Sequence, residues 1–185
     1  MSIDALHSLI PAYGRDLSLN LNALLAETTL SDQQKWGSFL SCAYAIGVPE
    51  VVQALERAAA DVITPEAVTA AKAAAAIMGM NNVYFRALHL MHNKEYEDMR
   101  SGLRMNVLTN PGVDKVDFEL WALAVSAVNA CGLCIDSHEQ ALRTHGVSAL
   151  QVQAALRIAA MVNAISAVIR AESAAKSTIS AVVSA

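Results

Sequence analysis

Residues 118–138 have the sequence FELWALAVSAVNACGLCIDSH, which is almost wholly apolar up to position 130 and then carries two cysteines and a histidine. The apolar part is typical of a buried helix, and Asp117 is placed to cap its first turn. We expect the chain to break near Gly132, and a second helix to follow over residues 131–145. This stretch therefore predicts two helices joined by a tight reversal, with the cysteines at the reversal.

Helix signals also dominate the rest of the chain. Thr64-Pro65-Glu66 is a strong start for a long Ala-rich helix, and Ser31-Asp32-Gln33-Gln34 fits a capping box. No stretch alternates apolar and polar residues as a half-buried strand does, and the four prolines stand where helices should begin or end. We predict an all-α fold, with helices at residues 3–10, 15–26, 33–46, 50–60, 65–90, 118–130, 131–145 and 148–171.

Two halves of the chain share a pattern at an offset of about 85 residues. Trp36 and Trp121 each begin an apolar helix, and a break follows each helix, at Gly47-Val48-Pro49 and at Gly132-Leu133-Cys134. A long Ala-rich helix then closes each half. An internal repeat of this kind predicts two similar helical units packed about a pseudo-two-fold axis.

The repeat sets the expected domain organisation. Residues 1–185 should form a single domain, with a first unit at about 31–90 and a second, redox-active unit at about 116–171. The small residues of 172–185 should form a tail that frays.

The first unit serves as an internal control for the chemistry of the second. It has no Cys-x-x-Cys, no histidine after its break, and Gln34 where the second unit has Glu119. Its lone cysteine, Cys42, lies in an apolar helix and is expected to be a buried structural thiol. Met78, in the long helix, is expected to fill space in the core. The chemistry is therefore predicted to belong to the second unit.

Composition excludes several classes of protein. The chain has 185 residues, 55% of them hydrophobic and 16% charged, with a net charge of −4 and no basic cluster, which argues against nucleic acid as a partner. So few charges suggest that some surface is hidden in an oligomer. No targeting segment is visible, and the longest nearly apolar stretch, residues 122–135, is too short to span a bilayer. We expect a cytoplasmic protein without a membrane segment.

Cys131, Cys134 and His138 allow three interpretations. They could be buried thiols in an Ala-rich core, or zinc ligands with Glu119 as the fourth ligand. The third interpretation is a redox dithiol, because the first turn of a helix stabilises a thiolate and a second cysteine nearby can resolve an oxidised sulfur. His138, one helical turn after Cys134, could move the proton.

Glu119 can join this cluster only if the chain reverses. Along one unbroken helix it would lie about 18 Å from Cys131, at about 1.5 Å per residue. A reversal would make the two helices antiparallel and return the carboxylate to the sulfurs and to His138. The alternative role for Glu119 is a carboxylate that favours its own helix N-terminus.

Several motifs along the chain combine into a specific pattern. They are Phe118-Glu119-Leu120-Trp121, Ser126-Ala127-Val128-Asn129, Cys131-x-x-Cys134-x3-His138-Glu139, residues 77–83 (IMGMNNV), residues 102–106 (GLRMN) and Asn110-Pro111-Gly112. Together they resemble the AhpD family of alkyl hydroperoxide reductases, in the wider carboxymuconolactone-decarboxylase-like superfamily. The resemblance covers essentially the whole chain apart from the small-residue tail.

The resemblance implies an all-α homotrimer with a cytosolic antioxidant role. Cys134 would be the peroxidatic cysteine, oxidised to a sulfenic acid by an organic hydroperoxide, and Cys131 would resolve it to a disulfide. Glu119 and His138 would form the proton relay. The protein partner would be an AhpC-type peroxiredoxin, reduced through a mixed disulfide at Cys134. Electrons would come from dihydrolipoamide on a lipoylated acyltransferase, kept reduced by a dihydrolipoamide dehydrogenase, with no bound cofactor or metal.

One position departs from the family pattern. Some members carry a relay histidine immediately before the second cysteine, where this chain has Leu133. Two other functions stay open at this point. A carboxymuconolactone-decarboxylase-type lyase would use Glu119 and His138 as acid and base without redox chemistry, and a zinc-stabilised helical adaptor would use the cysteines as ligands.

Overall fold

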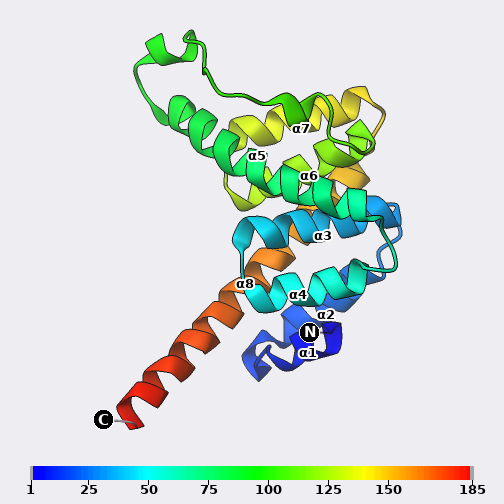
Figure 1. Cartoon of the computed structure of the whole chain (residues 1–185), viewed down its shortest axis with the longest axis vertical. Helices are drawn as coiled ribbons and strands as arrows, with labels where there is room; N and C mark the ends of the chain where they lie inside the picture. The colour runs from blue at the N-terminus through cyan, green and yellow to red at the C-terminus, as the bar shows by residue number, and fades with distance from the viewer. Residues whose placement is uncertain (1, 184–185) are drawn as a thin grey trace.

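The computed structural model describes residues 2–183, with the side-chain surroundings given for residues 2–176 (Figure 1). The described residues contain helices and connections and no strand, so the predicted all-α fold is confirmed. The elements in chain order are α1 (Ile3–Ser8), η1 (Ala12–Gly14), α2 (Arg15–Leu25), α3 (Asp32–Ile46), α4 (Pro49–Ala59), α5 (Pro65–Leu90), η2 (Lys94–Glu97), η3 (Asn106–Leu108), α6 (Lys115–Val128), α7 (Gly132–Thr144) and α8 (Ala149–Val183).

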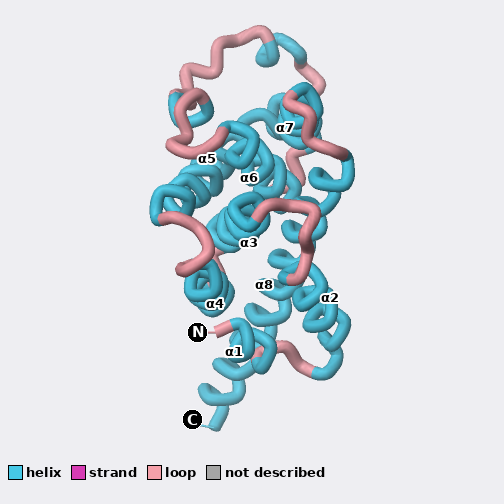
Figure 2. The backbone as a smooth tube through the Cα atoms, turned by 90° about the vertical axis from the view of Figure 1, so that its right-hand side faces the viewer, coloured by secondary structure: helices cyan, strands magenta, loops and turns pink. Residues whose placement is uncertain are grey.

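Helices α3 and α6 form the centre of the molecule, and each contacts α5 and α8. Figure 2 shows the end of the molecule where α5, α6 and α7 gather, opposite α1, α2 and the end of α8. Both central helices are apolar on nearly every side, because each is surrounded by other helices. Their largest fully buried side chains are Phe39, Phe118 and Trp121.

Gly37 and Trp121 set the distance between the two central helices. A Cβ atom at Gly37 would lie only 2.0 Å from Cε2 of Trp121, so the indole ring rests directly against the α3 backbone. The indole Nε1 donates a hydrogen bond to the main-chain oxygen of Gln34, at 3.2 Å. The ring therefore locks the first turns of α6 onto α3 and fixes the helix that carries Glu119.

The predicted helix starts are right in two cases and wrong in one. Ser31 forms the expected capping box with Gln34, and Thr64 caps α5. Asp117, however, does not cap α6. The helix begins at Lys115 with Asp114 as its cap, because the Asp114 carboxylate accepts the main-chain N–H of Val116.

Asp117 instead joins the two central helices. It is buried, and its two carboxylate oxygens accept hydrogen bonds from the side chains of Gln33 and Gln34 on α3, at 2.7 and 3.0 Å. A buried carboxylate is tolerable when both oxygens are paired in this way. The sequence showed an acidic residue near a helix start, and the contact across 84 residues was not visible in it.

Helix α8 is longer than the predicted 148–171 and continues to Val183. Both views show its C-terminal part projecting beyond the other helices (Figures 1 and 2). Residues 149–176 are long and apolar enough to cross a membrane by length and composition, so residues 122–135 are not the longest apolar stretch. Slightly more than half of the most apolar window is buried against the other helices, as in many core helices. Fraying of the tail stays a prediction, and residues 184–185 lie outside the described residues.

Each of the two predicted units corresponds to a run of successive helices. Helices α3, α4 and α5 fall within residues 31–90, and α6, α7 and most of α8 within residues 116–171. The internal repeat and the single-domain organisation themselves stay predictions.

Candidate active site

The active-site reversal lies between α6 and α7. Helix α6 ends at Val128, Ala130 has a left-handed backbone with φ of 53°, and Cys131 is the N-terminal cap residue of α7. The main-chain N–H of Cys131 donates to the carbonyl of Ser126, which closes the turn at 3.1 Å. The predicted chain break at this point is confirmed.

Cys131 and Cys134 are joined by a disulfide bond. Cys131 is fully buried, whereas Cys134 keeps 6% of its surface exposed in the first turn of α7. No side chain caps this helix, so its first N–H groups are free to face a negative charge on a sulfur. The position favours the thiolate form of a cysteine once the disulfide is reduced.

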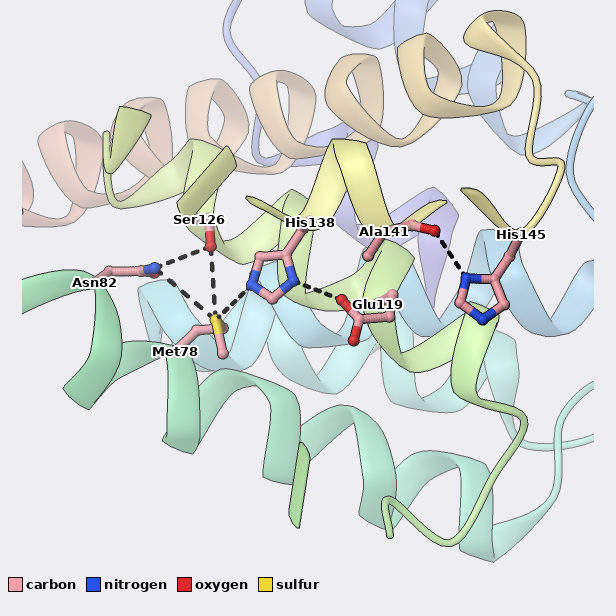
Figure 3. A network of polar contacts seen from close by, with 7 residues as sticks. All are labelled: Met78, Asn82, Glu119, Ser126, His138, Ala141 and His145. Carbon is pink, nitrogen blue, oxygen red and sulfur yellow. Dashed lines mark hydrogen bonds and ion pairs between the residues drawn. The ribbon is translucent and has the colours of Figure 1, made fainter. Parts of the chain in front are cut away.

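The reversal also brings Glu119 to His138. The carboxylate oxygen Oε2 of Glu119, on α6, lies 2.7 Å from Nδ1 of His138, on α7 (Figure 3). The two side chains are only 15% and 13% exposed, so water screens the pair weakly. An antiparallel arrangement of α6 and α7 thus supplies the carboxylate–imidazole pair that the sequence argument required.

A cavity of about 400 Å³ opens beside this pair. Cys134 and His138 line it, and Cys131 does not. Leu133, which is 45% exposed, also lines the cavity. The remaining lining residues are mostly apolar and come from α5, α7 and the connection before α6: Met78, Asn81, Phe85, Met105, Leu108 and Ser137.

Several known proteins that are similar to this chain carry the name alkyl hydroperoxide reductase AhpD. The chain is 62% identical to the alkyl hydroperoxide reductase AhpD of Maricaulis maris, over 94% of this chain and 100% of that protein. This chain is 55% identical to the AhpD of Hyphomonas neptunium over 94% of this chain and 97% of that protein. It is 52% identical to the AhpD of Streptomyces avermitilis over 93% of this chain and 97% of that protein. The chain belongs to the AhpD family. Residues 94–177 also match the model of the carboxymuconolactone decarboxylase family.

Membership of the AhpD family makes the chain an oxidoreductase. The dithiol interpretation of the Cys-x-x-Cys pair agrees with it, because the two sulfurs are bonded to each other. Among the described residues, no group of three or more His, Cys, Asp and Glu side chains is placed to hold a metal ion.

Cys42 contrasts with the motif cysteines. It is free and fully buried in α3, and burial raises the pKa of its thiol to about 12. A thiol with so high a pKa is inert at neutral pH. The predicted structural role of Cys42 agrees with this environment.

Sequence reasoning missed one part of the AhpD site. Met78 on α5 was expected only to fill the core, yet its sulfur lies 3.3 Å from Nε2 of His138. Asn82 and Ser126 contact the same sulfur from the other side. The available signal was the stretch 77–83, one of the motifs that carry the family resemblance.

Proposed function

We propose that this protein reduces organic hydroperoxides at Cys134 and uses the resulting disulfide chemistry to regenerate a peroxiredoxin partner. The observation that carries the proposal is the placement of the two sulfurs. Cys134 lines the cavity together with His138, while Cys131 is fully buried behind it. A substrate in the cavity can therefore reach Cys134 first, which supports its peroxidatic role and the resolving role of Cys131.

The oxidising half-reaction has two steps. The Cys134 thiolate attacks the terminal oxygen of the hydroperoxide, the O–O bond breaks, and the alkoxide takes up a proton and leaves as an alcohol. Cys134 is then a sulfenic acid. The Cys131 thiolate attacks its sulfur, the S–O bond breaks, and hydroxide takes up a proton and leaves as water. The product is the Cys131–Cys134 disulfide, the state that the structure holds.

Glu119 and His138 are suited to move these protons. The carboxylate orients the imidazole through Nδ1, and the ring lies at the cavity beside Cys134. A histidine held in this way can take the thiol proton and deliver it to the departing oxygen. Leu133 lines the cavity where a second histidine stands in some relatives, so the relay in this chain would rest on Glu119 and His138.

Reduction of the disulfide completes the cycle. A dihydrolipoamide thiolate bonds to the sulfur of Cys134, the S–S bond breaks, and Cys131 leaves as a thiolate. The second lipoyl thiol then displaces Cys134 and forms lipoamide. The proposed donor is the lipoyl group of an acyltransferase kept reduced by a dihydrolipoamide dehydrogenase, with no cofactor bound to the protein. An AhpC-type peroxiredoxin would exchange disulfides at the same sulfur.

The proposal extends to the assembly and its location. The small share of charged residues supports an oligomer, which the family resemblance makes a homotrimer. The cysteine usage supports a reducing, cytoplasmic compartment, in which a disulfide is transient and catalytic.

A reconstituted assay tests the proposal. The protein is mixed with dihydrolipoamide dehydrogenase, NADH, a lipoylated acyltransferase and tert-butyl hydroperoxide, with and without an AhpC-type peroxiredoxin. NADH consumption that depends on both the protein and the lipoyl carrier is expected. If NADH consumption did not depend on the hydroperoxide, whether the peroxiredoxin was present or absent, the proposed function would be rejected. Sedimentation of the native protein would test the trimer.

A lyase reaction is the second candidate, because residues 94–177 match a family named for a decarboxylase and an acid–base pair is present. Such a reaction would use Glu119 and His138 without the thiols. Alkylation of the reduced protein separates the two functions: it should abolish peroxide reduction and leave a lyase active.

A further inference from the structure

Two hydrogen-bond donors and a ring nitrogen of His138 converge on the sulfur of Met78. The sulfur lies 3.3 Å from Nε2 of His138, 3.6 Å from Oγ of Ser126 and 3.8 Å from Nδ2 of Asn82 (Figure 3). The methionine is fully buried, so water does not share these contacts. A thioether sulfur accepts hydrogen bonds weakly and donates none, so any hydrogen in these contacts belongs to the neighbour.

The polar network behind Met78 keeps the sulfur in the accepting role. Asn129 donates from Nδ2 to Oδ1 of Asn82, at 3.0 Å, which leaves the Asn82 amide group to donate. That group donates to the Ser126 hydroxyl at 2.9 Å. The hydroxyl hydrogen of Ser126 then points to the sulfur of Met78, which is its described acceptor.

His138 is thus held between two acceptors of very different strength. The Glu119 carboxylate lies 2.7 Å from Nδ1, and the Met78 sulfur lies 3.3 Å from Nε2. A bare Nε2 would direct its lone pair at the lone pairs of the sulfur, whereas an Nε2–H makes a hydrogen bond there. The contact therefore favours a hydrogen on Nε2, with a second proton held between Nδ1 and Glu119.

We propose that Met78 is a positioning residue that keeps a proton on Nε2 of His138 while the dithiol is oxidised. The Glu119–His138 pair of the disulfide form would then hold two protons before a reductant arrives. Resting on the proposed function, this arrangement supplies the proton that Cys134 takes up when it leaves the mixed disulfide as a thiolate. The two lipoyl thiols release two protons to solvent as they form lipoamide, and the Cys131 thiolate and the Glu119–His138 pair each regain one proton from solvent.

Few ionisable groups surround the imidazole ring of His138, so the effect of Met78 on its Nε2 proton can be measured. Among the described residues that contact the ring or share its cavity, Glu119 of α6 is the ionisable partner, and Cys134 of α7 does not titrate while it is in the disulfide. The residues from α5 at this cavity, Met78, Asn81 and Phe85, carry no titratable group. Changing the sulfur therefore alters the acceptor at Nε2 and leaves the carboxylate at Nδ1 in place.

Nitrogen-15 NMR of the wild-type disulfide form tests the proton directly. The ring nitrogens of His138, assigned with a His138→Gln variant, should show a protonated Nε2 at pH 7. An Nε2 resonance typical of a bare nitrogen would overturn the proposal. This measurement needs no change at Met78, so it decides the matter even if a variant fails to fold.

Variants test the consequence for the reaction. Met78→Leu keeps the bulk and removes the acceptor, Met78→Gln restores an acceptor oxygen, and Met161→Leu controls for loss of a buried methionine in α8. The rate at which dihydrolipoamide reduces the disulfide is measured from pH 5.5 to 9. We expect Met78→Leu to lower this reduction rate about five-fold above pH 7 and by less below pH 7. A five-fold change corresponds to the loss of about one neutral hydrogen bond. Met78→Gln should recover most of the loss, and Met161→Leu should follow the wild type.

The outcomes separate this inference from the proposed function. A Met78→Leu profile equal to that of the wild type, or an equal loss in Met161→Leu, would overturn the role of the sulfur. A wild-type protein that accepts electrons from dihydrolipoamide but reduces no hydroperoxide would reject the proposed function and leave the Nε2 proton to be decided by NMR.

Discussion

The connection between α3 and α4 and the connection between α6 and α7 perform the same reversal with different residues. The first uses Gly47, with φ of 76°, and Pro49 at the first position of α4. Glycine has no Cβ to resist that backbone, and proline has no N–H to leave unpaired. The second uses Ala130, with φ of 53°, and then Cys131 as the cap. It places an alanine in a left-handed backbone, and Cys134 lies in the first turn of the helix that follows.

Cys42 and Cys134 occupy different environments, one inside a helix and the other at the start of a helix. Cys42 lies in the interior of α3 and is fully buried, so its thiol has a raised pKa of about 12. Cys134 lies in the first turn of α7, at a cavity that His138 also lines. The proposed reactivity of Cys134 depends on the helix N-terminus, the opening and the histidine that lie together at this sulfur.

The largest expected effect is the exchange of that sulfur for oxygen. Cys134→Ser should lower peroxide consumption by at least about 10³-fold, because the nucleophile is lost. Cys131→Ser should instead leave a sulfenic acid on Cys134 that dimedone traps and mass spectrometry detects. Cys42→Ala, the matched control in the first unit, should keep nearly full activity. Equal activity in both motif variants would show that the assigned roles are wrong.

The next effect comes from making the second unit resemble the first at the relay position. Glu119→Gln introduces the residue type of Gln34, which the predicted repeat aligns with Glu119, and it should lower peroxidase activity by about 100-fold, because the imidazole loses its carboxylate partner. Steady-state rates with tert-butyl hydroperoxide measure the loss. Glu139→Gln changes a half-exposed carboxylate that pairs with Arg143 and adjoins His138 in the chain, and it should change the rate less than about two-fold. A comparable loss in both variants would contradict a specific relay.

The packing of the two units predicts opposite outcomes for two glycines. Gly37→Ala would place a Cβ 2.0 Å from the Trp121 ring, and we expect a loss of about 2 kcal/mol in the free energy of unfolding. Gly79→Ala, inside α5, meets no atom within 4 Å and should gain about 0.5 to 1 kcal/mol. Urea denaturation measures both. If Gly37→Ala were as stable as Gly79→Ala, the close approach of Trp121 would be refuted.

A smaller effect is expected from exchanging the turn residues. Ala130→Gly should raise the free energy of unfolding by about 0.5 kcal/mol, because the left-handed backbone no longer opposes a Cβ. Gly47→Ala should lower it by about 1 kcal/mol for the converse reason. Thermal unfolding of both variants sharpens the comparison of the two reversals. Changes of the same sign would mean that the turns do not differ as described.

The smallest effect concerns a contact between the connection that precedes α3 and helix α8. Glu27 accepts hydrogen bonds from the side chain and main chain of Thr29 and pairs with Arg157 of α8, which together lower its pKa from 4.5 to about 2. A lowered pKa in the folded state stabilises the fold above the unfolded value, and this contribution is lost as the pH falls from about 4.5 to about 2.

Thr29→Val should expose this contribution, because it removes the hydroxyl donor to Glu27. The midpoint of thermal unfolding of the variant should lie slightly below that of the wild type at pH 7, and the difference should shrink as the pH falls toward 2. A difference that persists unchanged at pH 2 would assign the effect to packing instead.

The sequence predicted helix starts and chain breaks correctly where they depend on interactions between residues close together in the chain. Helix α3 begins where the capping box of Ser31 and Gln34 lies, and the break at Ala130 to Cys131 is in place, because caps and turns involve residues within a few positions of one another. The start of α6 was wrong because two aspartates compete near it. Asp114 takes the cap, and Asp117 is drawn to Gln33 and Gln34 across the core.

By itself, the sequence determined that the protein is all-helical, that it carries a redox-capable Cys-x-x-Cys pair and that a histidine follows one turn later, since helical periodicity and short spacings are local properties. The tertiary structure decided which sulfur meets the cavity, and it placed Glu119 at 2.7 Å from His138. It alone showed the buried sulfur of Met78 against the same ring, 60 residues away in the chain. These contacts depend on how α5, α6 and α7 pack, and packing is set by the fit of whole helix surfaces.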